Sequence, residues 1–218
     1  MGDNSLIFFL SELIGVVAFS IAGTLSALRR ELDILGAMII GCVTAVGGGL
    51  TRDIILGINP PSMFINPVYT ATAAGASALT LIAAYLVKRF RVRMPKDSDE
   101  IINIFDALGL GVFVTVGVDT VAQRGYSQNA FLAIFIGTVT CIGGGMMRDI
   151  MLGSIPMVLR KQVYAVPCTL GAVIYYYGKP VLHETPAVII TVIFVITMRV
   201  LAAHFRWDLP KIRMDSRK

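Results

Sequence analysis

The chain has 218 residues, of which 56% are hydrophobic and only 15% are charged, and its mean hydropathy is +0.75. Soluble domains carry charge at about a quarter of their positions, so the composition excludes an ordinary soluble domain and indicates an integral membrane protein. The formal net charge is +5, and most basic residues lie in the segments between apolar runs. This placement indicates that the charge sets the orientation of the chain in the membrane, and it does not favour a nucleic-acid partner.

Seven apolar segments are long enough to cross a bilayer of roughly 30 Å, which takes about 20 residues of helix. They are continuous and do not alternate as barrel strands would, so helices are the expected spanning elements. The first segment has no basic residues before it and is long for a signal sequence, so we expect a retained helix. The segments begin at Leu6, Leu35, Asn66, Ile101, Ala130, Gln162 and Pro186.

Basic residues are unevenly divided between the two faces that seven spans would create. One face receives fourteen lysines and arginines and the other receives two. Because an excess of Lys and Arg marks cytoplasmic loops, we expect an inner-membrane protein with its N-terminus outside and its C-terminus in the cytoplasm. The fourteen are Arg29, Arg30, Lys88, Arg89, Arg91, Arg93, Lys96, Arg160, Lys161, Arg206, Lys211, Arg213, Arg217 and Lys218; the two are Arg124 and Lys179; Arg52, Arg148 and Arg199 are set apart because they fall inside predicted spans.

The two halves of the chain repeat one unusual motif. Residues 47–57 read GGGLTRDIILG and residues 143–153 read GGGMMRDIMLG, and the helix before each motif shares an acid, two glycines and a phenylalanine. An odd number of spans in each unit means that the second unit enters the membrane from the opposite face. Such pairs build their working site near the bilayer midplane. The sequence therefore predicts an all-α membrane protein of seven transmembrane helices. We expect a first three-helix repeat at 1–93 and a cytoplasmic linker at 94–100. A second, inverted three-helix repeat would follow at 101–180, and a seventh helix with a basic cytoplasmic tail at 181–218.

Three successive glycines predict an interrupted helix in each repeat. Each glycine in a helix interior costs about 1 kcal/mol relative to alanine, so the second and fifth helices are expected to kink or unwind at Gly47, Gly48, Gly49, Gly143, Gly144 and Gly145. Such a break would free carbonyl oxygens that suit a cation. The alternative is that the glycines serve only close helix packing. The candidate carbonyls are those of Thr44, Ala45, Val46, Thr140, Cys141 and Ile142.

The motif also carries an Arg-Asp pair inside an apolar segment, Arg52-Asp53 and Arg148-Asp149. Neighbours on a helix point about 100° apart, so we expect each arginine to find its partner on another helix. Inverted symmetry predicts one contact between Glu12 and Arg52 and one between Asp106 and Arg148. The alternative is an arginine that extends to the membrane surface without a partner.

A polar path between the second and fifth helices follows from these expectations. Its hydroxyl groups would come from Ser20, Thr44, Thr51, Thr138 and Thr140, although such side chains also bond to their own helix. The residues alone allow either a channel, which needs a continuous wet path, or a carrier of glycine or another small amino acid. In a carrier, a half-helix N-terminus would bind the carboxylate and Glu12 or Asp106 would bind the amine.

The pattern does not favour an enzyme, a metal site or a cofactor. His183 and His204 have no nucleophile or ligand set around them in the sequence. The three cysteines, Cys42, Cys141 and Cys168, lie in apolar segments without CxxC spacing, which is typical of small buried side chains.

The doubled GGGxxRD block, within two inverted three-helix units and a seventh helix, resembles the trimeric intracellular cation (TRIC) channel family in its prokaryotic branch, which is also catalogued as a bacterial glycine-transporter-domain family. The resemblance covers about Leu6 to His204. It implies a homotrimer in the membrane lipid, with a pore in each subunit that conducts monovalent cations such as potassium. It also implies that the second and fifth helices line the pore and kink at their glycines, where K⁺ would meet the freed carbonyls.

Overall fold

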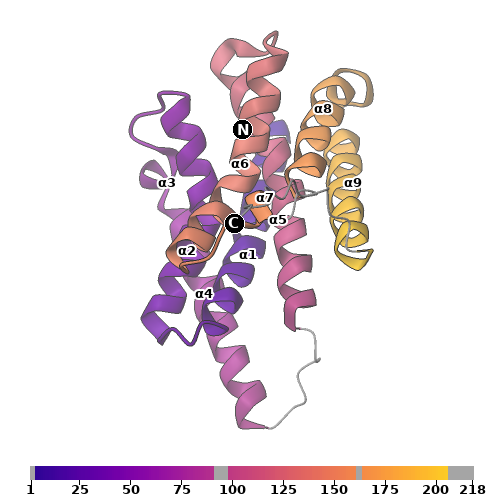
Figure 1. Ribbon diagram of the computed structural model, residues 1–218. Helices are drawn as coiled ribbons and strands as arrows, with labels where there is room; N and C mark the ends of the chain where they lie inside the picture. The colour runs from indigo at the N-terminus through magenta and orange to yellow at the C-terminus, as the bar shows by residue number, and fades with distance from the viewer. Residues whose placement is uncertain (1–2, 91–97, 161–163, 206–218) are drawn as a thin grey trace, which may run out of the picture.

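The computed structural model describes residues 3–90, 98–160 and 164–205, and these residues are helical apart from short connections (Figure 1). The first repeat contains α1 (Asp3–Leu28), α2 (Ile34–Ile55), the short α3 (Ser62–Ile65) and α4 (Pro67–Arg89). The second contains α5 (Ser98–Val121), which continues into a π-helical turn at Ala122–Tyr126, then α6 (Ala130–Met151), the short α7 (Met157–Arg160) and α8 (Ala165–Leu182). The final helix is α9 (Glu184–His204).

The helix ends follow from local side-chain chemistry. The carboxylate of Asp33 accepts a hydrogen bond of 2.6 Å from the Gly36 N–H at the start of α2, and the side chain of Asn129 accepts one of 3.0 Å from the Leu132 N–H at the start of α6. These side chains satisfy N–H groups that the helix itself leaves open. Beyond the other end of each helix, Gly57 and Gly153 adopt φ values of 67° and 65°, a region that favours glycine.

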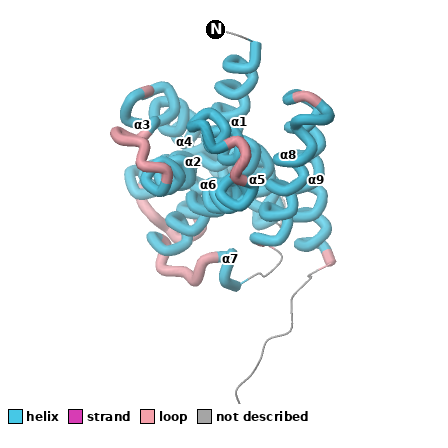
Figure 2. Tube along the Cα trace, turned by 90° about the horizontal axis from the view of Figure 1, so that it is seen from above, coloured by secondary structure: helices cyan, strands magenta, loops and turns pink. Residues whose placement is uncertain are grey.

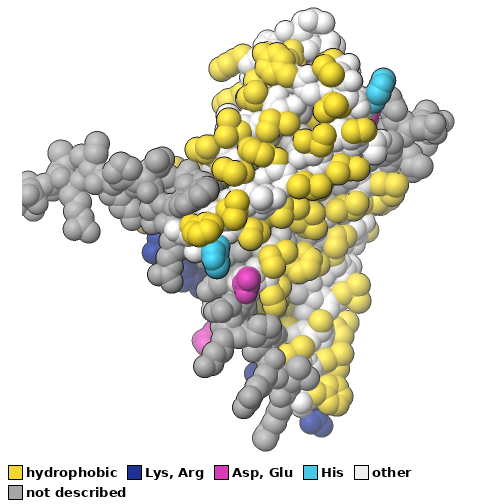
Figure 3. Space-filling model, turned by 90° about the vertical axis from the view of Figure 1, so that its right-hand side faces the viewer, with side chains coloured by type: hydrophobic (Ala, Val, Ile, Leu, Met, Phe, Trp, Pro, Cys, Tyr) yellow, Lys and Arg dark blue, Asp and Glu magenta, His cyan; other side chains and the backbone are white. Residues whose placement is uncertain are grey.

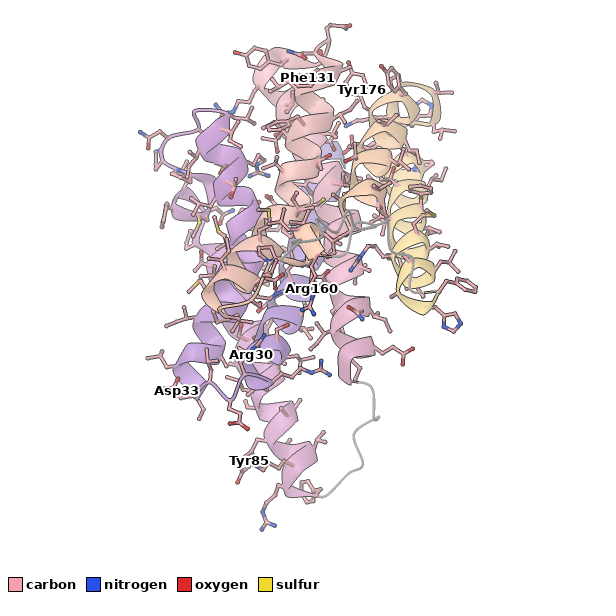
Figure 4. All side chains as sticks on the ribbon, in the orientation of Figure 1. Arg30, Asp33, Tyr85, Phe131, Arg160 and Tyr176 are labelled. Carbon is pink, nitrogen blue, oxygen red and sulfur yellow. The ribbon has the colours of Figure 1, made fainter. Side chains whose placement is uncertain are left out.

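The two repeats have the same packing and opposite directions. α4 packs against α1 and α2 as α8 packs against α5 and α6, and the halves meet where α1 contacts α5 and α2 contacts α6. Seen from above, α2, α6 and α5 occupy the middle of the bundle, with α8 and α9 to one side (Figure 2). Asp33, before α2, and Phe131, in the first turn of α6, lie toward opposite ends of the molecule (Figure 4). This arrangement confirms the predicted inverted repeats.

The contact between α1 and α5 uses matched residues from the two repeats. The rings of Phe19 and Phe113 stack with their centroids 5.3 Å apart. A methyl group at Gly15 would lie 2.8 Å from the Phe113 ring, and one at Gly109 would collide with the Phe19 ring. The shared glycines and phenylalanines of the two repeats therefore form one symmetric core contact.

Six helices among the described residues are long and apolar enough to cross a membrane, so the predicted count of seven is not reproduced in full. These six are α1, α2, α4, α5 together with its π-helical turn, α6, and α9. The helix α8 occupies the position that α4 has in the first repeat. It has 18 residues, and three tyrosines together with Lys179 make it less apolar than the others.

The outer surface of the bundle is largely apolar. Figure 3 shows hydrophobic side chains spread over the face that α8 and α9 present, and exposed residues there include Leu170, Val181, Ile189 and Ile193. A surface of this kind suits contact with hydrocarbon. Several expectations lie outside the described residues, namely most of the linker at 94–100, the basic residues Arg91, Arg93, Lys96 and Lys161, and the tail from Arg206 onward.

Candidate functional site

The first of two charged clusters lies between α1 and the end of α2, and we call it the first site. It consists of Glu12, Arg52 and Asp53, which are 6%, 3% and 1% exposed. The Arg52 Nη1 atom is 3.4 Å from the Glu12 Oε1 atom. The predicted contact between these two residues is therefore confirmed.

The second cluster lies between α5 and the end of α6, and we call it the second site. It consists of Asp106, Arg148 and Asp149, all of them buried. The Arg148 Nη1 atom donates a hydrogen bond of 2.9 Å to the Asp106 Oδ1 atom, so the second predicted contact is also confirmed. The arginines have partners, and the alternative of an unpaired arginine at a helix end does not apply to them.

The expectation that neighbouring Arg and Asp residues would not pair is wrong. The Arg52 Nε atom donates to the Asp53 Oδ1 atom at 2.8 Å, and the Arg148 Nε atom donates to the Asp149 Oδ1 atom at 2.9 Å. The Cβ atoms do point apart, but the long arginine side chain folds sideways. Its Nε and Nη1 atoms can then serve two carboxylates in different directions.

The two aspartates also tie down the segment that follows each helix. The Asp53 Oδ2 atom accepts a hydrogen bond of 2.7 Å from the Ser62 N–H, and the Asp149 Oδ2 atom accepts one of 2.8 Å from the Met157 N–H. In both repeats the chain therefore turns back at the motif glycine and starts its short helix, α3 or α7, against the aspartate. Each aspartate thus links the charged site to the fold.

The glycines do not interrupt their helices, so the predicted unwinding is wrong. α2 and α6 are α-helical through Gly47–Gly49 and Gly143–Gly145. A methyl group at Gly48 would collide with the carbonyl of Thr140, and one at Gly144 would collide with the carbonyl of Thr44. The glycines let the two backbones touch, as the packing alternative proposed.

The carbonyls that a break would have freed remain within continuous helices. This applies to Thr44, Ala45, Val46, Thr140, Cys141 and Ile142, all of which are helical. An unbroken α-helix uses its backbone carbonyls for its own hydrogen bonds. The structure therefore does not bear out a cation site at these oxygens.

The candidate hydroxyl groups mostly bond to their own helices. The hydroxyls of Thr44 and Thr140 donate to the carbonyls of Ile40 and Ile136, each at 2.6 Å. Those of Thr51 and Thr138 donate in the same way to the carbonyls four residues earlier, at 2.9 and 2.8 Å. The hydroxyl of Ser20 instead donates to the Ala73 carbonyl of α4 at 2.7 Å.

A small cavity of about 20 Å³ adjoins the first site. Glu12, Arg52 and Asp53 line it together with Tyr69 and apolar side chains of α1, α2 and α5. A volume of this size is close to the space needed for one water molecule. The carboxylates of the first site therefore lie beside a space that can hold a water molecule.

Residues that the sequence analysis did not connect to the sites complete the second one. The Arg199 Nη2 atom of α9 lies 3.6 Å from the Asp106 Oδ2 atom, and the Arg199 guanidinium carbon lies 4.2 Å from the centre of the Tyr164 ring. The sequence feature that could have indicated this contact is Arg199 itself, an arginine inside the last apolar segment. Its partners could not be inferred because α9 has no counterpart in the first repeat.

Asp119, which breaks the repeat symmetry in the sequence, belongs to a separate polar contact. Its carboxylate accepts hydrogen bonds of 2.7 Å from the Tyr175 hydroxyl and from the Lys179 Nζ atom. The Lys179 Nζ atom is also 3.5 Å from the Glu184 Oε2 atom. This contact joins α5 to α8 and to the start of α9.

Comparison with known proteins agrees with the repeat. A family model described as glycine transporter matches residues 9–85 and 103–180, which are the two repeats. The chain is 34% identical to the inner membrane protein YadS (UPF0126) of Escherichia coli K12, over 94% of this chain and 95% of the relative. It is 31% identical to the membrane protein YvgT (UPF0126) of Bacillus subtilis 168, over 95% of this chain and 98% of the relative.

Solved structures give the same result for the fold. A prokaryotic TRIC channel crystallised in 0.5 M KCl superposes with a TM-score of 0.82 at 31% identity, covering 94% of this chain and all of the other. The TRIC orthologue from Rhodobacter sphaeroides superposes with a TM-score of 0.80 at 27% identity, covering 92% of this chain and 99% of the other. With its two GGGxxRD blocks and its inverted repeats, the chain belongs to the prokaryotic TRIC channel family.

Proposed function

We propose that the protein is a channel for monovalent cations, with potassium among them. The observation that carries the proposal is the match of nearly the whole chain to structures described as TRIC cation channels. The buried carboxylates agree with it, because ionisable groups inside a membrane protein commonly line a pathway.

We propose that the cation path follows the contact between α2 and α6 within each subunit. It would pass the first site, then the point where α2 and α6 cross at their glycines, and then the second site. The glycines at this crossing are Gly47, Gly48, Gly49, Gly143, Gly144 and Gly145. Because backbones touch at the crossing, the described conformation would be closed there. We assign the attraction of cations to the carboxylates, since both helices are continuous.

Purified protein in planar bilayers under a potassium chloride gradient tests this function. We expect discrete current steps that reverse near the potassium equilibrium potential, since buried carboxylates favour cations over chloride. Saturable glycine uptake into liposomes, without unitary currents, would overturn the channel proposal and support the carrier. A mock preparation from cells that lack the protein, purified in the same way, is the control for contaminating channels.

We further propose a homotrimer, as the name of the TRIC relatives implies. The mass of the detergent-solubilised particle, with bound detergent subtracted, should equal three chains. A particle of one or two chains would contradict this assembly. The YadS relative is described as an inner membrane protein, and we propose the same location here, with the basic C-terminal side in the cytoplasm.

A further inference from the structure

The two sites differ in one charge, and that charge comes from outside the repeats. Each repeat places one arginine between two carboxylates, which gives each site a formal charge of −1. Arg199 of α9 then approaches Asp106 of the second site and is itself only 6% exposed. The second site with Arg199 is therefore formally neutral, whereas the first site stays at −1.

Several polar atoms around Arg199 have no hydrogen-bond partner among the described residues. They come from residues that are at least 94% buried, and buried polar groups are normally hydrogen-bonded to protein or to water. The four atoms are Asp106 Oδ2, Arg148 Nη2, Tyr164 OH and Arg199 Nε.

Two of these atoms lie together beside α6, and Arg199, which carries a third, contacts Asp106, which carries the fourth. A methyl group at Gly145 would lie 2.8 Å from the Tyr164 hydroxyl oxygen and 3.6 Å from the Arg148 Nη2 atom. Arg199 covers the ring of the same tyrosine at 4.2 Å. Buried polar groups of this kind are normally satisfied by protein or by ordered water.

We propose that Arg199 controls how strongly the second site attracts a permeating cation. The inference rests on the proposed cation channel. With Arg199 present, a cation is attracted by the net charge of Glu12, Arg52 and Asp53 at the first site, and it meets no net attractive charge at the second. The helix α9 thereby makes a symmetric pair of sites electrically asymmetric, and the current should depend on the side from which cations enter.

The test is the ratio of unitary currents at the two polarities in symmetric 0.1 M KCl, measured for wild type and for Arg199→Gln. A unit charge about 7 Å from a cation in a water-filled path changes its local concentration about threefold. Arg199→Gln should therefore raise the current carried by cations that enter from the side of the second site about threefold relative to the opposite current. In 1 M KCl the change should shrink, because the Debye length falls to about 3 Å.

Two variants separate the charge from other effects. Arg199→Lys keeps the charge and should keep the wild-type current ratio. Arg160→Gln removes an exposed arginine at the end of α7, on the segment that follows the second site (Figure 4), and should also leave the ratio unchanged. If Arg199→Gln does not fold, Arg199→Met carries the same prediction, because its unbranched stem can still pack on the Tyr164 ring.

The outcomes distinguish this inference from the proposed function. A wild-type protein without cation current would refute the channel itself. A wild-type protein that conducts, with Arg199→Gln or Arg199→Met giving an unaltered current ratio, would overturn the role of Arg199 and leave the channel standing. A change of equal size in Arg160→Gln would also overturn it, since the effect would then follow surface charge.

Discussion

At the scale of single residues, the motif arginine is the centre of each site because its guanidinium group serves two carboxylates. Arg148 donates through Nε to Asp149 on its own helix and through Nη1 to Asp106 on the neighbouring helix. An ammonium group lacks this planar fork of donors, so lysine could not reproduce the arrangement. The residue type in the motif is therefore explained by geometry as well as by charge.

Asp106→Asn should destabilise the protein more than Glu12→Gln does. Removing the Asp106 charge leaves Arg148 and Arg199 buried opposite Asp149 alone, and breaking a buried pair typically costs about 3–5 kcal/mol. Glu12 contacts Arg52 at a longer distance, 3.4 Å, and Arg52 keeps Asp53 at 2.8 Å. Thermal unfolding of both variants in detergent measures the difference. Equal losses of stability at the two positions would contradict the idea that Asp106 offsets the charge of Arg199 as well as that of Arg148.

At the scale of elements, the triple glycines determine how closely two helices approach. The same residue type can break a helix or admit a neighbouring backbone, so the motif by itself does not decide between the two. In this protein the carbonyls of Thr44 and Thr140 occupy the space where glycine lacks a side chain. The close approach therefore explains the motif without a break.

Alanine at Gly48 or Gly144 should separate α2 from α6. Its methyl group would overlap a backbone carbonyl, which cannot move aside as a flexible side chain would, and overpacking costs about 1–3 kcal/mol. We expect a matching loss in the free energy of unfolding, together with a higher open probability if the path follows this contact. Gly75→Ala is the control, because Gly75 is helical in α4 and a methyl group there would have no neighbouring atom within 4 Å. Equal stability of Gly75→Ala and Gly144→Ala would refute the packing explanation.

Much of the fold was accessible from the sequence at this scale. Hydropathy predicted the helices, the doubled motif predicted a repeat, and the odd number of spans in each unit predicted that the second unit is inverted. The repeat symmetry also predicted the partners Glu12–Arg52 and Asp106–Arg148. The pairing of Arg52 with Asp53 was missed because Cβ directions on a helix do not describe where a long, flexible side chain places its nitrogen atoms.

At the scale of the whole molecule, α9 is the element that removes the symmetry. It packs against α5 and α8 of the second repeat, and it brings Arg199 to the second site. The first repeat has no comparable helix among the described residues. Two structurally similar halves can therefore present different electrostatics to the two sides of the membrane.

The orientation of the molecule can be checked by cysteine labelling of cells. Gln128 follows α5 and its π-helical turn, whereas Glu100 lies at the start of α5, and both are exposed. A membrane-impermeant maleimide should label Gln128→Cys in intact cells and label Glu100→Cys only after permeabilisation, because the positive-inside rule places the basic side in the cytoplasm. Wild type is the background control, with Cys141 and Cys168 buried and Cys42 partly buried. The opposite pattern would reverse the orientation.

The sequence by itself determined that the protein is a helical membrane protein, that it is built from two inverted repeats, and which acid on the neighbouring helix contacts each motif arginine. These properties follow from hydropathy and from symmetry along the chain, which need no knowledge of distances. The tertiary structure alone decided that the glycines close a helix crossing and that Arg199 and Tyr164 complete the second site. Those outcomes depend on which backbone and which side chain from a distant part of the chain fill the space beside each residue.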